Sequence, residues 1–223
     1  KETDNKKISR IKDIIKNLAE VYGTPEWKPR LKPLDELIFT VLTQNTSDLN
    51  AEKAFLKLKS LGSWKNILET SDSKIAKLIK SGGMSNIKSK RILGILNEIK
   101  KRNKKLDISF LSELTLNDAR QWLTSIDGIG PKTASVLLSF SFNMPAIPVD
   151  THVHRVSKRL ELITNKTNAE DAHYILEKLV EDKKKYSFHV LLINHGRKKC
   201  YARNPKCKEC SLNIICNYNN NMR

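Results

Sequence analysis

A lysine placed after a glycine-rich turn is the first residue of this chain whose type and setting could do chemistry. In the stretch DGIGPKTAS, residues 127–135, Gly128 and Gly130 come just before Pro131 and Lys132. Glycine reaches turn conformations at the least cost, and proline is tolerated at the first position of a helix, where its missing N–H would lack a helical partner anyway. The pattern predicts a tight turn into a helix that begins at Pro131.

Asp150 is the second candidate, because it precedes another helical stretch in the segment VDTH, residues 149–152. The positive end of a helix dipole and the surrounding lysines favour the uncharged amine of Lys132, and capping N–H groups favour the carboxylate form of Asp150. A neutral amine beside a charged carboxylate suits covalent attack on an electron-poor sugar carbon. A surface lysine and a helix-capping aspartate are each common, so neither residue alone indicates catalysis.

The turn itself is a candidate binding site for an anion. Backbone N–H groups of the turn and of the first helical turn point outward together, and a DNA phosphate would fit them. Gly128, Gly130 and Thr133 are therefore candidate DNA-binding residues. An ordinary corner between two helices is the alternative interpretation, since Gly-x-Gly alone is weak evidence.

Four cysteines fall within one short polar segment, and their spacing reads C-x6-C-x2-C-x5-C from Cys200 through Cys207 and Cys210 to Cys216. This clustering indicates one local metal site rather than a disulfide framework. Structural zinc is the alternative to an iron–sulfur cluster, although only the Cys207–Cys210 spacing is typical of zinc. Basic residues interleave with these ligands, and an ordered loop would present them to phosphates; they are Lys198, Lys199, Arg203, Lys206 and Lys208.

The overall charge points to a polyanionic partner. The 223 residues include 41 basic and 24 acidic ones, which gives a formal net charge of +17, whereas solubility needs a net charge of only about 2 to 8. No apolar run approaches the roughly 18 residues of a membrane span, and no secretory segment opens the sequence. We expect an intracellular protein, in the cytoplasm and nucleoid of a prokaryote or in the nucleus or an organelle of a eukaryote. An organelle address preceding Lys1 stays open.

The hydrophobic pattern predicts an all-α protein, since nothing alternates with period two for long. Apolar residues at helical spacing predict helices within residues 8–22, 34–42, 51–61, 75–79, 92–99, 151–160, 168–180 and 187–195. The stretch LNDARQWLTSI predicts a helix with Asn117 as its N-cap and Ile126 at its end. The apolar stretch ASVLLSFSF could be a strand by periodicity, but a helix started by Pro131 fits its neighbours better.

Taken together, the motifs resemble the endonuclease III family, the helix-hairpin-helix, Gly-Pro-Asp superfamily of DNA glycosylases. The matching segments are LTQNTSD at 42–48, GIGPKTA at 128–134, VDTH at 149–152 and the four cysteines. The resemblance implies two helical lobes with DNA in a groove between them. It implies a helical barrel domain over residues 34–144 that ends in the hairpin, and an iron–sulfur domain formed by residues 1–33 and 145–223.

The resemblance also implies the reaction. Lys132 resembles the amine that attacks the deoxyribose C1′, expels the base and holds the sugar as a Schiff base, and Asp150 resembles the carboxylate that assists it. The expected activity is removal of oxidised pyrimidines from double-stranded DNA, followed by strand cleavage at the abasic site, by a monomer without membrane attachment. The alternatives are a relative acting on uracil, mismatched thymine or damaged purines, and a non-catalytic DNA-binding module.

Two loop residues resemble the pair that fills the gap left by a flipped nucleotide. They are Asn45 and Met84, although the family usually has glutamine and leucine there, and a one-residue shift would make Gln44 the filler. Helix capping by Asn45 and core packing by Met84 are the alternatives. For Cys200, Cys207, Cys210 and Cys216 the resemblance implies a [4Fe-4S] cluster.

Overall fold

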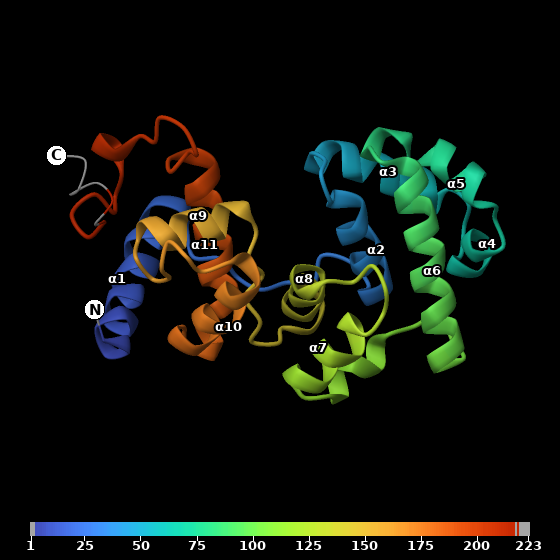
Figure 1. Cartoon of the computed structure of the whole chain (residues 1–223), viewed down its shortest axis with the longest axis horizontal. Coiled ribbons are helices and arrows are strands. Elements are labelled where there is room, and N and C mark those ends of the chain that lie inside the picture. Colours follow the sequence, from blue (N-terminus) through green and yellow to red (C-terminus); the bar gives the residue numbers. More distant parts are fainter. Residues whose placement is uncertain (1–2, 217, 219–223) are drawn as a thin grey trace. The chain divides into compact units, whose positions relative to one another are not determined.

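The computed structural model describes residues 3–216 and 218, and every regular element in these residues is a helix (Figure 1). The all-α prediction is therefore confirmed. The chain divides into two compact units: one is Pro29–Phe142, and the other combines Lys1–Lys28 with Asn143–Arg223. In the described residues, no helix has the length and apolar character that crossing a membrane would require.

The unit Pro29–Phe142 is built around one apolar helix, α8. Its helices are α2 (Pro33–Thr43), α3 (Asp48–Lys59), α4 (Trp64–Leu68), α5 (Asp72–Leu78), α6 (Ser85–Asn103), α7 (Leu116–Thr124) and α8 (Pro131–Phe142), with short 3-10 segments at Lys80–Gly82 and Ser109–Glu113. Helix α8 packs against both α2 and α7. Its residues from Thr133 to Ser139 are all buried, so the stretch lacks the polar face that helical periodicity would reveal.

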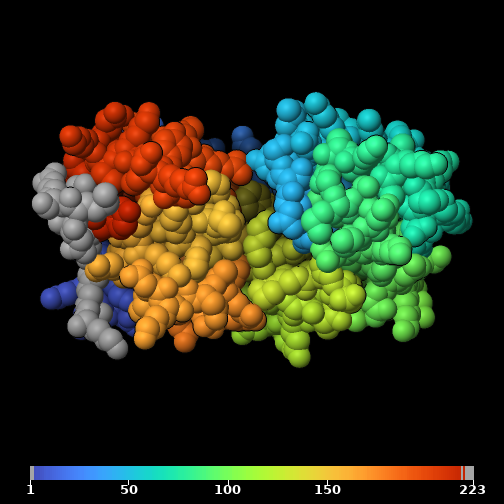
Figure 2. Space-filling view, turned by 45° about the horizontal axis from the view of Figure 1, so that its top comes forward, coloured from blue at the N-terminus to red at the C-terminus, as the bar shows by residue number. Residues whose placement is uncertain are grey.

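The second unit joins the N-terminal helix to the C-terminal part of the chain. Its helices are α1 (Asp4–Tyr22), α9 (Thr151–Arg159), α10 (Ala169–Leu179) and α11 (Lys185–Lys198), with 3-10 segments at Asp182–Lys184 and Cys207–Glu209. Ile11, Ile14 and Leu18 of α1 share one core with residues of α9, α10 and α11, such as Phe188. In the space-filling view, the red C-terminal segment lies against the yellow-orange region that contains α9 (Figure 2).

Several local predictions were wrong in detail. Helix α7 is capped by Thr115, whose side chain accepts a hydrogen bond from the Asp118 N–H, and not by Asn117. The helix ends at Thr124, because the chain must already turn toward the hairpin two residues before Ile126. The short helix α4 was not predicted, since its five residues span too few turns to show a periodicity.

Candidate functional site

The turn between α7 and α8 forms the expected hairpin, but its two glycines have different roles. Gly128 has a φ of +88°, and a Cβ at this position would lie 2.7 Å from Cγ of Arg91. Gly130 has no positive φ and open space around it; its carbonyl accepts the first helical hydrogen bond of α8, from the Ala134 N–H at 3.0 Å. The turn therefore requires glycine at Gly128 both for its conformation and for the close approach of α6.

Lys132 is half-buried and stands second in α8, directly after Pro131. Because the first helical bond is made by Ala134, the amides of Lys132 and Thr133 precede the hydrogen-bonded part of the helix. This end of the helix carries the positive end of the dipole. The hairpin thus presents an amine and backbone donors at the same helix terminus, an arrangement that can bind an anion and bring a nucleophile to it.

A hydrogen-bonded relay connects the hairpin to the loop after α2. The guanidinium of Arg91 donates to Gln44 Oε1 at 2.6 Å, and Gln44 Nε2 donates to Thr133 Oγ1 at 3.3 Å. Thr133 is only 3% exposed. Both the oxygen and the nitrogen of the Gln44 side-chain amide are therefore hydrogen-bonded within this unit. One of the partners, Thr133, directly follows Lys132 in the sequence.

Asn45 and Met84 lie together, although 39 positions separate them in the sequence. Asn45 Nδ2 is 3.7 Å from the Met84 sulfur, and Met84 is 50% exposed. Both residues have left-handed backbones, with φ of +54° and +48°. Residues other than glycine rarely take this conformation without tertiary support, so the pair marks a constrained site.

Asp150 caps α9, as predicted. One carboxylate oxygen, Oδ1, accepts hydrogen bonds from the backbone N–H of His152 at 2.9 Å and of Val153 at 2.8 Å. The side chain is half-buried. Its orientation is thereby set by the helix, while Oδ2 carries none of these capping bonds.

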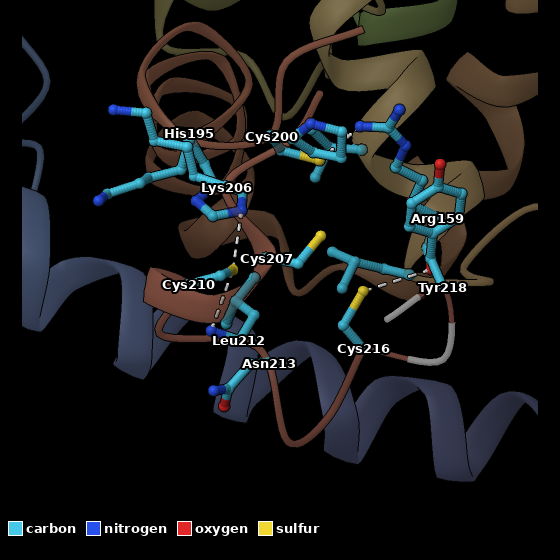
Figure 3. Close-up of a pocket in the computed structure, with 14 residues that line it drawn as sticks. Arg159, His195, Cys200, Lys206, Cys207, Cys210, Leu212, Asn213, Cys216 and Tyr218 are labelled. Carbon is cyan, nitrogen blue, oxygen red and sulfur yellow. Dashed lines mark hydrogen bonds between the residues drawn. The ribbon is translucent and has the colours of Figure 1, made fainter. Parts of the chain in front are cut away.

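The four cysteines line one pocket of the second unit, and Figure 3 shows them around it. All four are partly buried and carry free thiols. Among the described residues, no group of three or more His, Cys, Asp or Glu side chains is close enough together to hold a single metal ion. Four thiols that line one pocket are a donor set that either an iron–sulfur cluster or a zinc ion can use.

Two arginines of α9 hold the loop that begins at Cys200. Arg159 Nη1 donates to Cys200 Sγ at 3.1 Å (Figure 3). It also donates to the carbonyl of Tyr201 at 2.6 Å. Arg155 donates to the carbonyls of Cys200 and Gly196. The helix that Asp150 caps therefore also orders the first cysteine and places a cation beside its sulfur.

Burial dominates the electrostatics of the pocket. It raises the pKa of the Cys210 thiol to about 11, with the other three cysteines adding to the rise and the Leu212 N–H opposing it. Burial likewise lowers the pKa of His195 to about 4. His195 Nε2 lies 3.5 Å from Cys210 Sγ, and its Nδ1 lies 3.3 Å from the Tyr22 hydroxyl. Burial therefore favours the protonated thiol of Cys210 in the absence of a bound metal.

The basic residues around the cysteines are not all available to phosphates. Lys199 forms an ion pair with Glu209 at 2.7 Å, and the ammonium of Lys198 lies over the ring of Tyr22. The exposed cations of this loop are Arg203, Lys206 and Lys208. The predicted basic surface therefore rests mainly on these three.

Sequence reasoning missed Lys88, which is 2% exposed and donates to the carbonyls of Leu42, Gln44 and Gly82. A signal was present, because Lys88 lies four positions before Ile92 on the buried stripe of α6. The roles of Arg91, Arg155 and Arg159 were missed as well. Their partners are distant in sequence, so no local pattern indicates them.

Comparison with known proteins gives the family. Residues 38–182 match the model of the HhH-GPD superfamily of base excision DNA repair proteins. The chain is 31% identical over 185 residues to Endonuclease III of Sulfolobus acidocaldarius, covering 82% of this chain and 80% of that protein. It is 32% identical over 187 residues to Endonuclease III of Thermotoga maritima, covering 83% of each.

A solved structure with the same fold is a trapped covalent intermediate of Endonuclease III with DNA. It has a TM-score of 0.83 and 25% identity, and the match covers 97% of this chain and 99% of that one. The hairpin, the capped aspartate and the cysteine pocket thus occur in a chain that matches the family over most of its length. The chain belongs to the HhH-GPD superfamily of base excision DNA repair proteins and, within it, to the endonuclease III family of DNA glycosylases.

Proposed function

We propose that the protein is a bifunctional DNA glycosylase and abasic-site lyase that removes oxidised pyrimidines. The observation that carries this proposal is the position of Lys132, an amine at the N-terminus of α8 directly after the hairpin turn. Relatives named Endonuclease III support it, and so does the likeness to a solved structure of a trapped covalent intermediate of Endonuclease III with DNA.

In the proposed reaction, the neutral amine of Lys132 attacks C1′ of the extruded nucleotide. The bond between C1′ and the base breaks, and its electron pair and a proton leave with the base. Positive character develops on the sugar ring, and the Asp150 carboxylate stabilises it. The nitrogen lone pair then expels O4′ from C1′, which opens the sugar ring and forms the iminium, while O4′ takes up a proton. Loss of a proton from C2′ forms the C2′–C3′ double bond as the C3′–O bond breaks and the 3′ phosphate leaves. Water finally hydrolyses the iminium and releases the lysine.

The DNA-binding part of the proposal uses residues of the unit Pro29–Phe142. The hairpin around Gly128 and Gly130 binds a phosphate through backbone N–H groups, and Thr133 supports it through Gln44. Asn45 and Met84 fill the gap that the flipped nucleotide leaves, with Met84 as an exposed apolar wedge. Gln44 is the weaker candidate for that role because its amide is already bonded to Arg91 and Thr133.

We also propose that Cys200, Cys207, Cys210 and Cys216 hold a [4Fe-4S] cluster. The four thiols that line one pocket, and the guanidinium of Arg159 beside Cys200, support thiolate ligands of an iron–sulfur group. The cluster would order the polar loop that carries Arg203, Lys206 and Lys208 toward phosphates. Visible absorbance and iron content of the purified protein test this assignment against zinc.

Borohydride trapping tests the main proposal. The wild type should form a covalent adduct with duplex DNA containing an abasic site, and Lys132→Ala should lose it while still binding the same DNA. An undiminished adduct in Lys132→Ala would remove Lys132 from the mechanism. Single-turnover excision from a panel of oxidised pyrimidines, uracil, mismatched thymine and damaged purines assigns the lesion, and a chain inactive on every abasic duplex would be a DNA-binding module instead.

A further inference from the structure

Lys88 is a buried cation that the proposed reaction does not use. It is the fourth residue of α6 and is 2% exposed. Burial lowers its pKa, and the nearby charge of Arg91 lowers it further. A lysine near the N-terminus of a helix also opposes the helix dipole. Neither helix formation nor hydrophobic packing explains why a lysine occupies this buried position. Its hydrogen-bond partners must therefore explain it.

The three N–H donors of the Lys88 ammonium match three backbone acceptors. Nζ lies 2.7 Å from the carbonyl oxygen of Leu42, 2.6 Å from that of Gln44 and 2.8 Å from that of Gly82. An ammonium has three donors and no acceptor, so the site satisfies it fully. Hydrogen bonds to a charged donor are among the stronger ones in proteins, at about 1.5–3 kcal/mol each.

The three carbonyls lie at the end of α2 and in the two segments that lead to Asn45 and Met84. The carbonyl of Gln44 is part of the peptide bond to Asn45, and Gly82 lies two residues before Met84. Lys88 therefore joins the end of α2 to the start of α6, at the point where the backbone turns left-handed in both loops. Left-handed backbone in non-glycine residues persists where surrounding contacts enforce it.

We propose that Lys88 is a positioning residue that holds the Asn45 and Met84 loops in the geometry needed to fill the gap in duplex DNA. The inference rests on the proposed gap-filling role of these two residues. Lys88 itself touches no substrate in this role. Its effect should therefore appear with a duplex, where a gap must be filled, and not with a single strand, where there is none.

The test compares Lys88→Met with Lys90→Met, which removes an exposed lysine from the same helix. Single-turnover excision from lesion-containing duplex should fall by about tenfold in Lys88→Met, the effect of about 1.4 kcal/mol on the barrier. The yield of borohydride trapping on single-stranded abasic DNA should stay within about twofold of the wild-type yield, since a single strand has no gap to fill. Lys90→Met should match wild type in both assays.

Equal losses on both substrates would reduce Lys88 to a general structural role, and unchanged duplex excision would also overturn the proposal. Thermal unfolding followed by circular dichroism shows whether the variant is folded. If Lys88→Met is unfolded, Lys88→Gln replaces it, because glutamine keeps two donors for the three carbonyls. The same two assays apply, and excision from duplex should again fall more than trapping on single-stranded DNA.

A binding assay separates this inference from the proposed reaction. In a Lys132→Ala background, the protein is added to duplex DNA with 2-aminopurine opposite an abasic site, and insertion into the gap should raise the emission of that base. The rise should be smaller when Lys88→Met is added. No rise with Lys88 intact would contradict the gap-filling role itself, whereas equal rises with and without Lys88 would contradict only its positioning role.

Discussion

Asn45 and Met84 form a contact pair in which both backbones are left-handed. The Asn45 amide nitrogen lies 3.7 Å from the Met84 sulfur, and the two φ angles are +54° and +48°. Asparagine tolerates this region through local hydrogen bonding, but methionine gains nothing from it. The chain keeps an exposed apolar side chain in a strained position, which is the pattern of a residue retained for contact with a partner.

Met84→Gly should separate strain from function. Glycine removes the conformational penalty but adds freedom to the unfolded chain, so the free energy of unfolding should change by less than about 1 kcal/mol. Excision from lesion-containing duplex should fall, because the wedge is gone. Met84→Leu keeps an apolar wedge and should retain most of the activity. Denaturant titration and single-turnover excision measure the two effects, and a fully active glycine variant would argue against a wedge.

Gly128→Ala should damage the hairpin, whereas Gly130→Ala should not. A Cβ at Gly128 would lie 2.7 Å from Arg91 Cγ in a backbone with φ of +88°, and such strain costs about 1–3 kcal/mol. At Gly130 the space is open and φ is ordinary, so alanine should leave stability unchanged or raise it by about 0.4–1 kcal/mol. Chemical denaturation measures both. Equal destabilisation by the two substitutions would mean that the turn is built differently.

Asp150→Asn should separate capping from charge. Asparagine caps helices about as well as aspartate, so the loss of stability should stay below about 1 kcal/mol. Loss of the carboxylate should slow single-turnover base release by about a hundredfold, since the developing positive charge on the sugar is no longer stabilised. Asp150→Ser is the matched control that also keeps a cap without a charge. If either variant released bases at the wild-type rate, Asp150 would be a cap only.

Arg159→Met should weaken retention of the proposed cluster. Arg159 donates to Cys200 Sγ at 3.1 Å and holds the carbonyls of Tyr201 and Ala202. Without Arg159, the visible absorbance of the purified protein in air should decay several-fold faster. At other metal sites, the loss of a residue that hydrogen-bonds to a ligand lowers metal affinity by about 10–100-fold. Lys158→Met removes a charge from the adjacent position and should leave the decay rate unchanged. Identical decay in both variants would contradict a role for Arg159 at the thiolate.

Removal of the iron of the proposed cluster should unfold the cysteine loop before it affects the hairpin. The segment after α11 has few apolar residues, so the proposed cluster would supply much of what holds the loop. Chelation after oxidation should make the chain around Cys200 and Cys207 sensitive to protease. The unit Pro29–Phe142 should keep its helical signal. Loss of both signals together would show that the two units do not unfold separately.

The elements near the hairpin were predictable because their signals are local. Proline at the first position of α8 and glycine in the turn before it each act within a few residues, and so does the Asp150 cap on α9. The Asn117 cap was wrong because two polar residues near the start of α7 could both serve, and only the fold selects Thr115. The roles of Lys132 and the four cysteines came from their resemblance to a family, and they remain proposals.

The sequence by itself determined most of the helices, the hairpin position, the capping aspartate and the grouping of the cysteines, since each depends on residues close together in the chain. Only the tertiary structure decided that Lys88 binds three carbonyls, that Arg91 reaches Thr133 through Gln44, and that Asn45 lies against Met84. Apart from the Lys88–Gly82 bond, these contacts join segments about 40 or more positions apart. A side chain's partners across such distances are set by how helices pack, which no local pattern of residues encodes.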